Sequence, residues 1–238
     1  MLGELRRADQ DFRMIADGDH VAAGVSGGKD SLLLLQALAM YRKFSPHPFR
    51  LTAVTVDMGL RPFDLSGVRE LCARLEVDYV VEPTEIGKIV FEERGEANPC
   101  ALCSRMRRGA LAAVCARIGA NKLALGHHRD DALETLLLSA LYEGRLHTFH
   151  PVTPFEDRGL VQIRPLAYLS EKQVLHAVKK LALPVVKSPC PADGGTKRAE
   201  AKALLDALCR YKPDARDLLL QALKNDAQYG LWEKRTND

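Results

Sequence analysis

Length, composition and charge exclude several classes of protein. The chain has 238 residues and a net charge of +3, and 47% of its residues are hydrophobic, which is enough to form a core and excludes a disordered chain. Runs of about 18 apolar residues are missing, and the N-terminal stretch MLGELRRADQDFRMI has no apolar segment of the kind found in secretion signals. We therefore expect a cytoplasmic protein with no membrane partner.

Apolar stretches typical of strands alternate with helical patterns along the first two thirds of the chain. We expect strands at 20–25, 51–56, 78–82 and 122–126, and helices at 30–43, 65–76, 130–142 and in a long segment after Cys103. Strands buried on both faces are apolar throughout, and they alternate with helices in βαβ units. The pattern predicts an α/β fold, with a parallel sheet and helices on both of its faces.

The rest of the chain departs from this alternation. Charged residues, Gly and Pro in 85–99 indicate an insertion that carries the sequence PCALCSRMRRG to the edge of the sheet. A hairpin or extended passage is expected at 160–165, followed by helices at 170–183, 197–210 and 213–229 with no further strand. We expect an N-terminal segment 1–18, an α/β domain 19–169 that includes the inserted segment 85–110, and a helical C-terminal region 170–238.

The sequence GVSGGKDS, residues 24–31, lies between the first strand and its helix and is not a Walker A loop. Ala23 stands where that loop begins with Gly, and Asp30 follows Lys29 where Ser or Thr would bind Mg²⁺. A glycine pair at a helix N-terminus still lets backbone N–H groups surround a phosphate. The alternative is a tight turn with Asp30 as a helix cap. The expected phosphate-binding residues are Ser26, Gly27, Gly28, Lys29, Asp30 and Ser31.

A second polar motif, GHHRDD at 126–131, ends the strand 122–126 and starts a helix, so it lies at the same edge of the sheet as the first loop. Asp130 or Asp131 could bind Mg²⁺ on the phosphates of ATP, and we select Asp131. Helix capping is the alternative, and it accounts for one of the two aspartates. We expect His127 and His128 to have surface or capping roles.

Three of the six cysteines are placed for chemistry. Cys100 and Cys103 form a C-x-x-C motif at the start of a helix, where backbone N–H groups lower thiol pKa values, and Cys190 lies between two prolines. Three thiolates do not complete a structural zinc site, which has four ligands. A redox disulfide between Cys100 and Cys103 remains an alternative. The other cysteines lie in helical patterns and are expected to be small buried apolar residues: Cys72, Cys115 and Cys209.

The loop SGGKDS resembles the pyrophosphate loop of the PP-loop ATP pyrophosphatases, which transfer AMP from ATP to a substrate oxygen. Together with PCALCSRMRRGAL, LALGHHRDDALETLLL, IRPLAYLSEKQV and SPCP in that order, it makes the chain similar to the tRNA 2-thiocytidine synthetase family from about Asp19 to Asn225. The resemblance implies the PP-loop (adenine nucleotide alpha hydrolase-like) fold. It also implies a 4Fe-4S cluster bound by Cys100, Cys103 and Cys190, with one iron left open for sulfide.

The same resemblance implies the reaction and its partners. ATP would adenylate a cytidine at tRNA position 32, and sulfide derived from a cysteine desulfurase would then replace AMP; a homodimer is possible. The adenosine would lie beside Val56 and Asp57 at the end of the second strand, with Gly126 nearby. The implied catalytic residues are Lys29, Asp30, Arg108 and Asp131. Arg105, Arg107 and Arg108 follow the C-x-x-C motif and could steer tRNA phosphates or neutralise the α-phosphate.

Two other functions fit parts of the pattern. Another PP-loop tRNA-modifying enzyme could thiolate a uridine or make lysidine, but lysidine synthesis needs no iron–sulfur cluster, and the chain lacks the extra C-x-x-C pairs of the related uridine thiolases. A nucleotide-gated metal- or redox-binding module without tRNA chemistry is the other alternative. ATP turnover that is stimulated by tRNA would distinguish the enzymes from the module.

Overall fold

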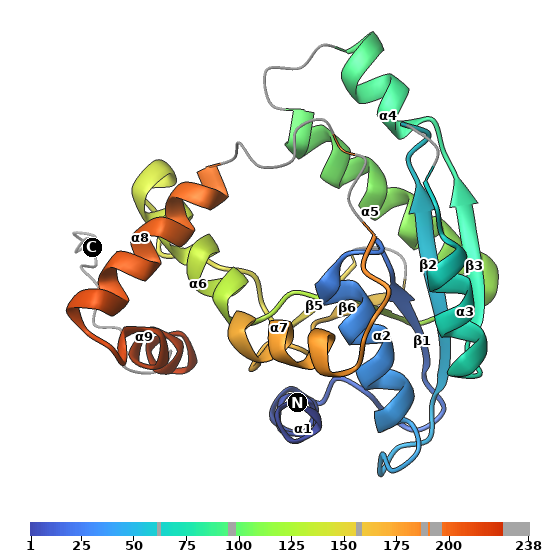
Figure 1. Ribbon diagram of the computed structural model, residues 1–238, viewed down its shortest axis with the longest axis horizontal. Coiled ribbons are helices and arrows are strands. Elements are labelled where there is room, and N and C mark those ends of the chain that lie inside the picture. Colours follow the sequence, from blue (N-terminus) through green and yellow to red (C-terminus); the bar gives the residue numbers. More distant parts are fainter. Residues whose placement is uncertain (61–62, 95–98, 156–158, 187–189, 191–196, 226–238) are drawn as a thin grey trace, which may run out of the picture. The chain divides into compact units, whose positions relative to one another are not determined.

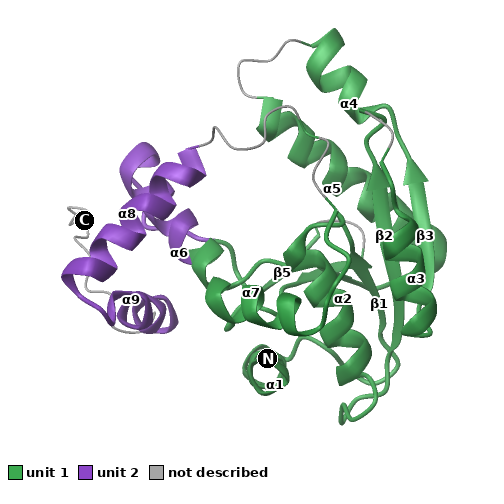
Figure 2. Ribbon diagram, in the orientation of Figure 1, with its two compact units in different colours: residues 1–132, 149–196 green, residues 133–148, 197–238 purple. Residues whose placement is uncertain are grey.

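A computed structural model describes residues 1–60, 63–94, 99–155, 159–186, 190 and 197–225. The chain forms two compact units (Figure 2): unit 1 contains residues 1–132 and 149–196, and unit 2 contains 133–148 and 197–238. This division differs from the expected domain boundaries, because the helix at 171–180 and the N-terminal helix both belong to unit 1. No helix in the described ranges combines the length and apolar character needed to cross a membrane.

Unit 1 is built on a mostly parallel six-stranded sheet with the strand order β3-β2-β1-β4-β6-β5 (Figure 1). The strands are β1 His20–Gly24, β2 Arg50–Asp57, β3 Asp78–Pro83, β4 Lys122–Ala124, β5 Val152–Pro154 and β6 Val161–Ile163. All neighbours pair in parallel except β5, which is antiparallel to β6. The predicted α/β parallel sheet is confirmed. Strand β5 was not expected, since three residues are too few to produce a periodic pattern.

Helices cover both faces of this sheet, as predicted. Helix α2 (Lys29–Tyr41) packs on β1 and β2 and also contacts α1 (Leu2–Phe12) and α7 (Glu171–Lys180). The four leucines at 32–35 are fully buried, because α2 is enclosed by the sheet on one side and by other helices on the other. Helix α3 (Ser66–Arg74) packs on β3.

Helix α5 (Pro99–Ile118) covers the other face and contacts β2 and β4. The connection from β3 to β4 runs across the sheet in the opposite direction to that from β1 to β2, so a right-handed crossover places α5 on the opposite face from α2. Its residues Val114 and Cys115 pack with Ala22 and Val54 of the sheet. The inserted segment before α5 contains α4 (Ile86–Lys88) and a π-helical turn, Ile89–Glu93.

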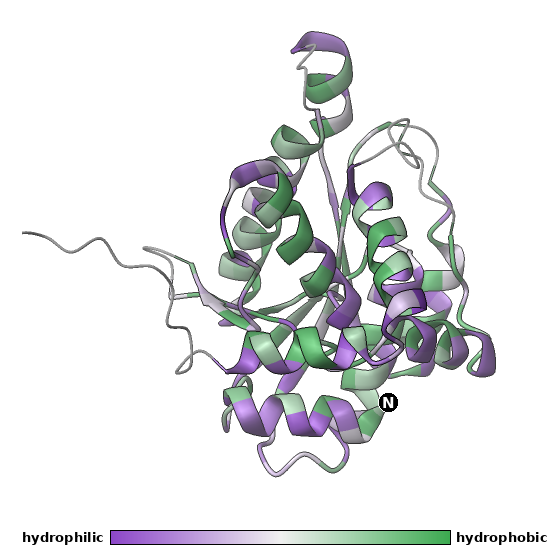
Figure 3. Cartoon of the chain, turned by 90° about the vertical axis from the view of Figure 1, so that its left-hand side faces the viewer, coloured by the Kyte–Doolittle hydropathy of each residue, from purple (hydrophilic) through white to green (hydrophobic). Residues whose placement is uncertain are grey.

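The other helices lie wholly or partly in unit 2. Helix α6 (Arg129–Leu138) starts in unit 1, passes into unit 2 and continues as a π-helical turn, Ser139–Glu143. Helices α8 (Lys197–Tyr211) and α9 (Ala215–Lys224) contact each other. The helix expected at 213–229 corresponds to α9, which is shorter at its start, and residues 226–229 of the expected helix lie outside the described residues. Most helices carry both polar and apolar residues along their length (Figure 3), which is typical of helices at a protein surface.

Candidate active site

The loop between β1 and α2 is closed by hydrogen bonds to one serine. Ser31 Oγ accepts from the backbone N–H of Ser26 at 3.1 Å and donates to the carbonyl oxygen of Gly28 at 2.9 Å. Gly27 has a φ of +77°, a left-handed conformation that favours glycine. Gly28 is the N-cap of α2 and has no side chain to cap it, so the alternative of a cap by Asp30 was wrong. The loop therefore directs the N-terminus of α2 toward the carboxyl edge of the sheet.

Gly126 brings the second motif against this loop. A Cβ atom at Gly126 would lie 2.9 Å from both the carbonyl carbon and the oxygen of Asp30 and 3.1 Å from the nitrogen of Ser31. The backbone after β4 thus touches the first turn of α2, and only glycine permits this approach. The structure therefore joins GVSGGKDS and GHHRDD into one continuous surface.

A group of charged side chains surrounds this contact. Lys29 Nζ lies 2.9 Å from both carboxylate oxygens of Asp30 and 3.7 Å from Glu171 of α7. The imidazole of His128 is 3.6 Å from Asp30 through Nε2 and 3.5 Å from Asp131 through Nδ1. His128 is only 3% exposed, so a surface role was wrong for it, but the expected capping role is confirmed: its Nδ1 atom accepts a hydrogen bond from the backbone N–H of Asp131 at 3.4 Å. Its ring also lies between the two carboxylates and links the two motifs.

The two aspartates of GHHRDD have different surroundings. Asp130 is buried, and its Oδ2 atom accepts a hydrogen bond from the backbone N–H of Glu171 at 2.8 Å, which fixes the start of α7. Asp131 accepts from the backbone N–H of His128 at 2.9 Å, and its side chain is 17% exposed. Because Asp131 is the more accessible of the two, it is the better candidate for a metal ligand, as selected from the sequence.

Cys100 and Cys103 lie on the first turn of α5 at the same edge of unit 1. Cys100 is exposed, whereas Cys103 is buried beside Ile86 and Val90, with its sulfur 3.6 Å from that of Met58. Burial raises the pKa of Cys103, and the neighbouring thiols of Cys190 and Cys100 raise it further. Arg107 acts in the opposite direction. The three predicted thiols are therefore close enough to influence one another electrostatically.

The chain shortly before Cys190 is hydrogen-bonded to the phosphate-binding loop. The backbone N–H of Val186 donates to the carbonyl oxygen of Gly27 at 2.9 Å, four residues before Cys190. Within the described ranges, no three His, Cys, Asp or Glu side chains converge on one metal ion. A single zinc ion would require such convergence, whereas each thiolate on a 4Fe-4S cluster binds a different iron. A 4Fe-4S cluster on the three cysteines therefore stays a prediction.

The remaining cysteines differ from one another. Cys72 and Cys115 are buried, and burial raises the pKa of each to about 11, as expected for small apolar residues of the core. Cys209 is only half-buried, and its sulfur accepts a hydrogen bond from Arg216 at 2.8 Å within unit 2. The expectation of burial was thus wrong for Cys209, because α8 turns this residue toward α9 rather than into a core.

Val56 and Asp57, the residues expected beside the adenosine, are the last two residues of β2, which pairs with β1. Val56 packs at the edge of the apolar cluster around Cys103. The Asp57 carboxylate accepts from the backbone N–H of Gly59 at 3.0 Å, and its carbonyl oxygen accepts from Thr84 at 2.8 Å. The Asp57 side chain therefore stabilises the turn after β2.

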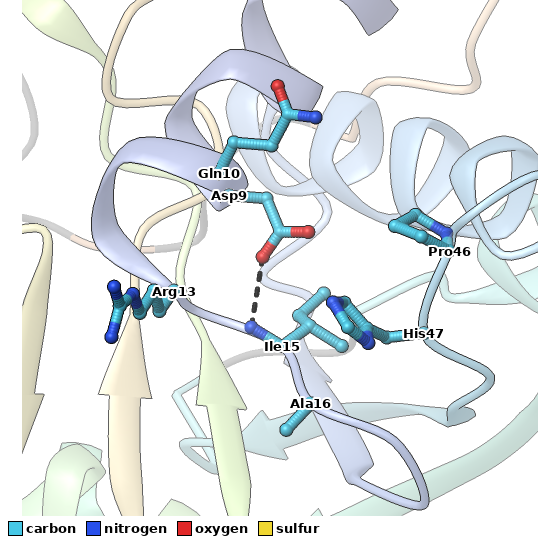
Figure 4. A pocket seen from close by; sticks show the side chains of 7 residues that line it. All are labelled: Asp9, Gln10, Arg13, Ile15, Ala16, Pro46 and His47. Atoms are coloured by element: carbon cyan, nitrogen blue, oxygen red, sulfur yellow. Dashed lines mark hydrogen bonds between the residues drawn. The ribbon is translucent and has the colours of Figure 1, made fainter.

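A cavity of about 410 Å³ lies elsewhere in unit 1 (Figure 4). It is lined by Asp9, Gln10, Arg13, Ile15, Ala16, Pro46 and His47. Ile15 and Ala16 precede the start of β1, whereas the phosphate-binding loop follows its end. The cavity thus lies at the opposite edge of the sheet and contains none of the predicted site residues.

Comparisons with known proteins identify the family of this chain. A family model described as a PP-loop domain matches residues 4–200. The tRNA-cytidine(32) 2-sulfurtransferase of Pelobacter propionicus is 39% identical over 92% of this chain and 82% of its own length, and that of Geobacter sulfurreducens is 36% identical over 92% and 86%. The fold is similar to that of the U34-tRNA thiolase NcsA from Methanococcus maripaludis, solved with its 4Fe-4S cluster, with a TM-score of 0.76, 24% identity and coverage of 98% and 81%.

Proposed function

The chain belongs to the PP-loop family that contains the tRNA-cytidine(32) 2-sulfurtransferases, and on this premise we propose that it uses ATP to convert a tRNA cytidine to 2-thiocytidine. One observation supports the proposal: the loop 24–31 and the motif 126–131 touch at one edge of the sheet, and the chain four residues before Cys190 is hydrogen-bonded to that loop. An enzyme that activates a base and then adds sulfur needs both groups of residues within reach of that base.

In the activation step, the loop and Lys29 bind the β- and γ-phosphates of ATP, and the C2 oxygen of the cytidine attacks the α-phosphorus. Pyrophosphate leaves, and the base carries AMP on its C2 oxygen. Asp131 is the proposed Mg²⁺ ligand, and Asp30 holds Lys29 in position through its 2.9 Å contacts. Catalysis at this stage is positioning and charge stabilisation.

In the sulfur-transfer step, sulfide attacks C2 and AMP leaves with the original oxygen. Cys100, Cys103 and Cys190 are the proposed ligands of a 4Fe-4S cluster, which would supply sulfide at an iron that has no protein ligand. Cys103 is buried among apolar side chains, whereas Cys100 is exposed and leaves this end of the site open to a sulfur donor. We propose that the sulfur atom comes from sulfide derived from a cysteine desulfurase. The proposed compartment is the cytoplasm. A homodimer remains a prediction.

Analysis of tRNA nucleosides by mass spectrometry tests this function. Deletion of the gene should remove 2-thiocytidine and leave 2-thiouridine and lysidine unchanged. The wild-type gene and a Lys43→Ala control, in which an exposed lysine at the end of α2 is removed, should restore the nucleoside, whereas Lys29→Ala should not. Loss of 2-thiouridine or lysidine instead would assign the chain another PP-loop reaction, and unchanged nucleosides would favour a binding module.

A further inference from the structure

A buried arginine without a carboxylate partner lies directly after β6. Arg164 is 7% exposed, and its Nη1 atom donates to the carbonyl oxygen of His150 and, at 3.1 Å, to Thr153 Oγ1. Its Nε atom is buried and makes no hydrogen bond, and no ion pair to Arg164 occurs within the described part of the chain. A buried charge is unfavourable unless it is paired, so this guanidinium favours the binding of an anion.

A second arginine, Arg108 of α5, lies near it: Arg164 donates to Thr153, and Arg108 stacks on Phe155, two residues further along the same extended stretch. Burial and the positive charge of Arg108 together lower the pKa of Arg164 to about 10. The two guanidinium groups are held by aromatic rings rather than by anions: Arg108 lies 4.4 Å from the centroid of Phe155, and Arg164 lies 4.6 Å from that of Phe149. Stacking fixes each guanidinium plane and leaves its edge available for hydrogen bonds.

The pair belongs to the same edge of the sheet as the nucleotide motifs. The backbone N–H of Leu125 donates to the carbonyl oxygen of Ile163 at 3.0 Å. The residues that follow these two, Gly126 and Arg164, therefore have neighbouring backbones. The ring of His127 is 5.1 Å from that of Phe149, which joins the arginines to the GHHRDD motif. Strand β4 separates β6 from β1, and two strand spacings place Arg164 roughly 10 Å from the phosphate-binding loop.

We propose that Arg108 and Arg164 together bind one phosphodiester of the acceptor tRNA, next to the cytidine that is modified. This inference rests on the proposed function and adds to it the contact that holds the RNA backbone. A phosphodiester fits because its two free oxygens accept from two guanidinium groups, and its negative charge offsets their repulsion. The loop proposed for the β- and γ-phosphates of ATP lies about two strands away, and the measurements below distinguish an RNA phosphate from the α-phosphate of ATP, because only the latter would change ATP affinity.

Binding measurements on the purified protein test the pair. The dissociation constant for tRNA is measured by fluorescence anisotropy at several salt concentrations, and that for ATP by calorimetry, for wild type, Arg108→Met, Arg164→Met and Arg164→Lys. Each methionine variant should bind tRNA about tenfold more weakly and reduce the slope of log Kd against log salt by about 0.7 to 0.9, as expected for one lost phosphate contact. ATP affinity should stay within twofold. Arg164→Lys should restore part of the tRNA affinity.

The double variant and a matched control sharpen the test. If both arginines bind one phosphate, the double methionine variant should bind tRNA no more than about twofold more weakly than the weaker single variant. Arg50→Met removes an exposed arginine at the start of β2, on the opposite edge, and should bind tRNA like wild type. Normal tRNA binding and salt slope in Arg164→Met would overturn the proposal, as would a selective loss of ATP affinity. Because only binding is measured, these results stand whichever base the enzyme modifies.

Discussion

Gly126→Ala tests the contact that joins the two nucleotide motifs. The added Cβ would lie 2.9 Å from the carbonyl carbon of Asp30, which is 0.5 Å shorter than the 3.4 Å at which ordinary contact begins. The atoms it meets are backbone atoms in the first turn of α2, so no side chain can rotate away. Gly126 does not have a positive φ, and the substitution therefore tests the close approach alone.

The expected consequence is a shift of about half an ångström between the loop and the GHHRDD motif. Overpacking of this kind costs roughly 1–3 kcal/mol of unfolding free energy, or a melting temperature lower by about 2–10 °C in a chain of this size. Misplacement by 1 Å costs about a hundredfold in rate, so half of it should reduce kcat/KM for ATP roughly tenfold.

The assay is tRNA-dependent release of pyrophosphate, combined with thermal unfolding. Gly3→Ala is the matched control, because a Cβ there has no atom within 4 Å and the residue lies in helix α1. This control should keep the wild-type rate and melting temperature or melt slightly higher. A Gly126→Ala enzyme with wild-type kcat/KM and stability would refute the argument that this glycine positions the two motifs.

Three further substitutions separate the parts of the site. Lys29→Ala should reduce turnover at least about a hundredfold, and the products of the wild type should be AMP and pyrophosphate on chromatography; ADP and phosphate would contradict a PP-loop reaction. Asp131→Asn should raise the Mg²⁺ concentration for half-maximal rate about tenfold. The iron content should not change, because the amide oxygen still accepts the hydrogen bond from the backbone N–H of His128 at the start of α6. An unchanged Mg²⁺ dependence would leave this residue a capping role alone. Cys103→Ala should lose the iron measured in anaerobically purified protein. The control Cys115→Ala, on the buried face of α5, should keep the iron and lose about 1–2 kcal/mol of stability; iron that depends on Cys115 instead would contradict the proposed ligands.

Local patterns in the sequence determined much of this protein. The order of strands and helices follows from apolar periodicity, because each element must bury one stripe or both faces. The loop between β1 and α2 follows from a glycine pair between a strand and a helix, and the C-x-x-C at the start of α5 places two cysteines on one turn of that helix. These features depend on neighbours within a few residues, so the chain itself encodes them.

The tertiary structure alone decided which distant side chains meet. His128 was expected at the surface or as a cap. It does cap α6, but the contact of Gly126 with α2 also places its ring between Asp30 and Asp131, which no local pattern indicated. Arg164 lies in the motif IRPLAYLSEKQV, yet the sequence assigned it no role, because an arginine next to a proline has no local pattern that indicates burial. Its position beside Arg108 depends on the pairing of β6 with β4 and on the crossover that places α5. Contacts between segments far apart in the chain are set by sheet order and helix packing, and local sequence does not contain that information.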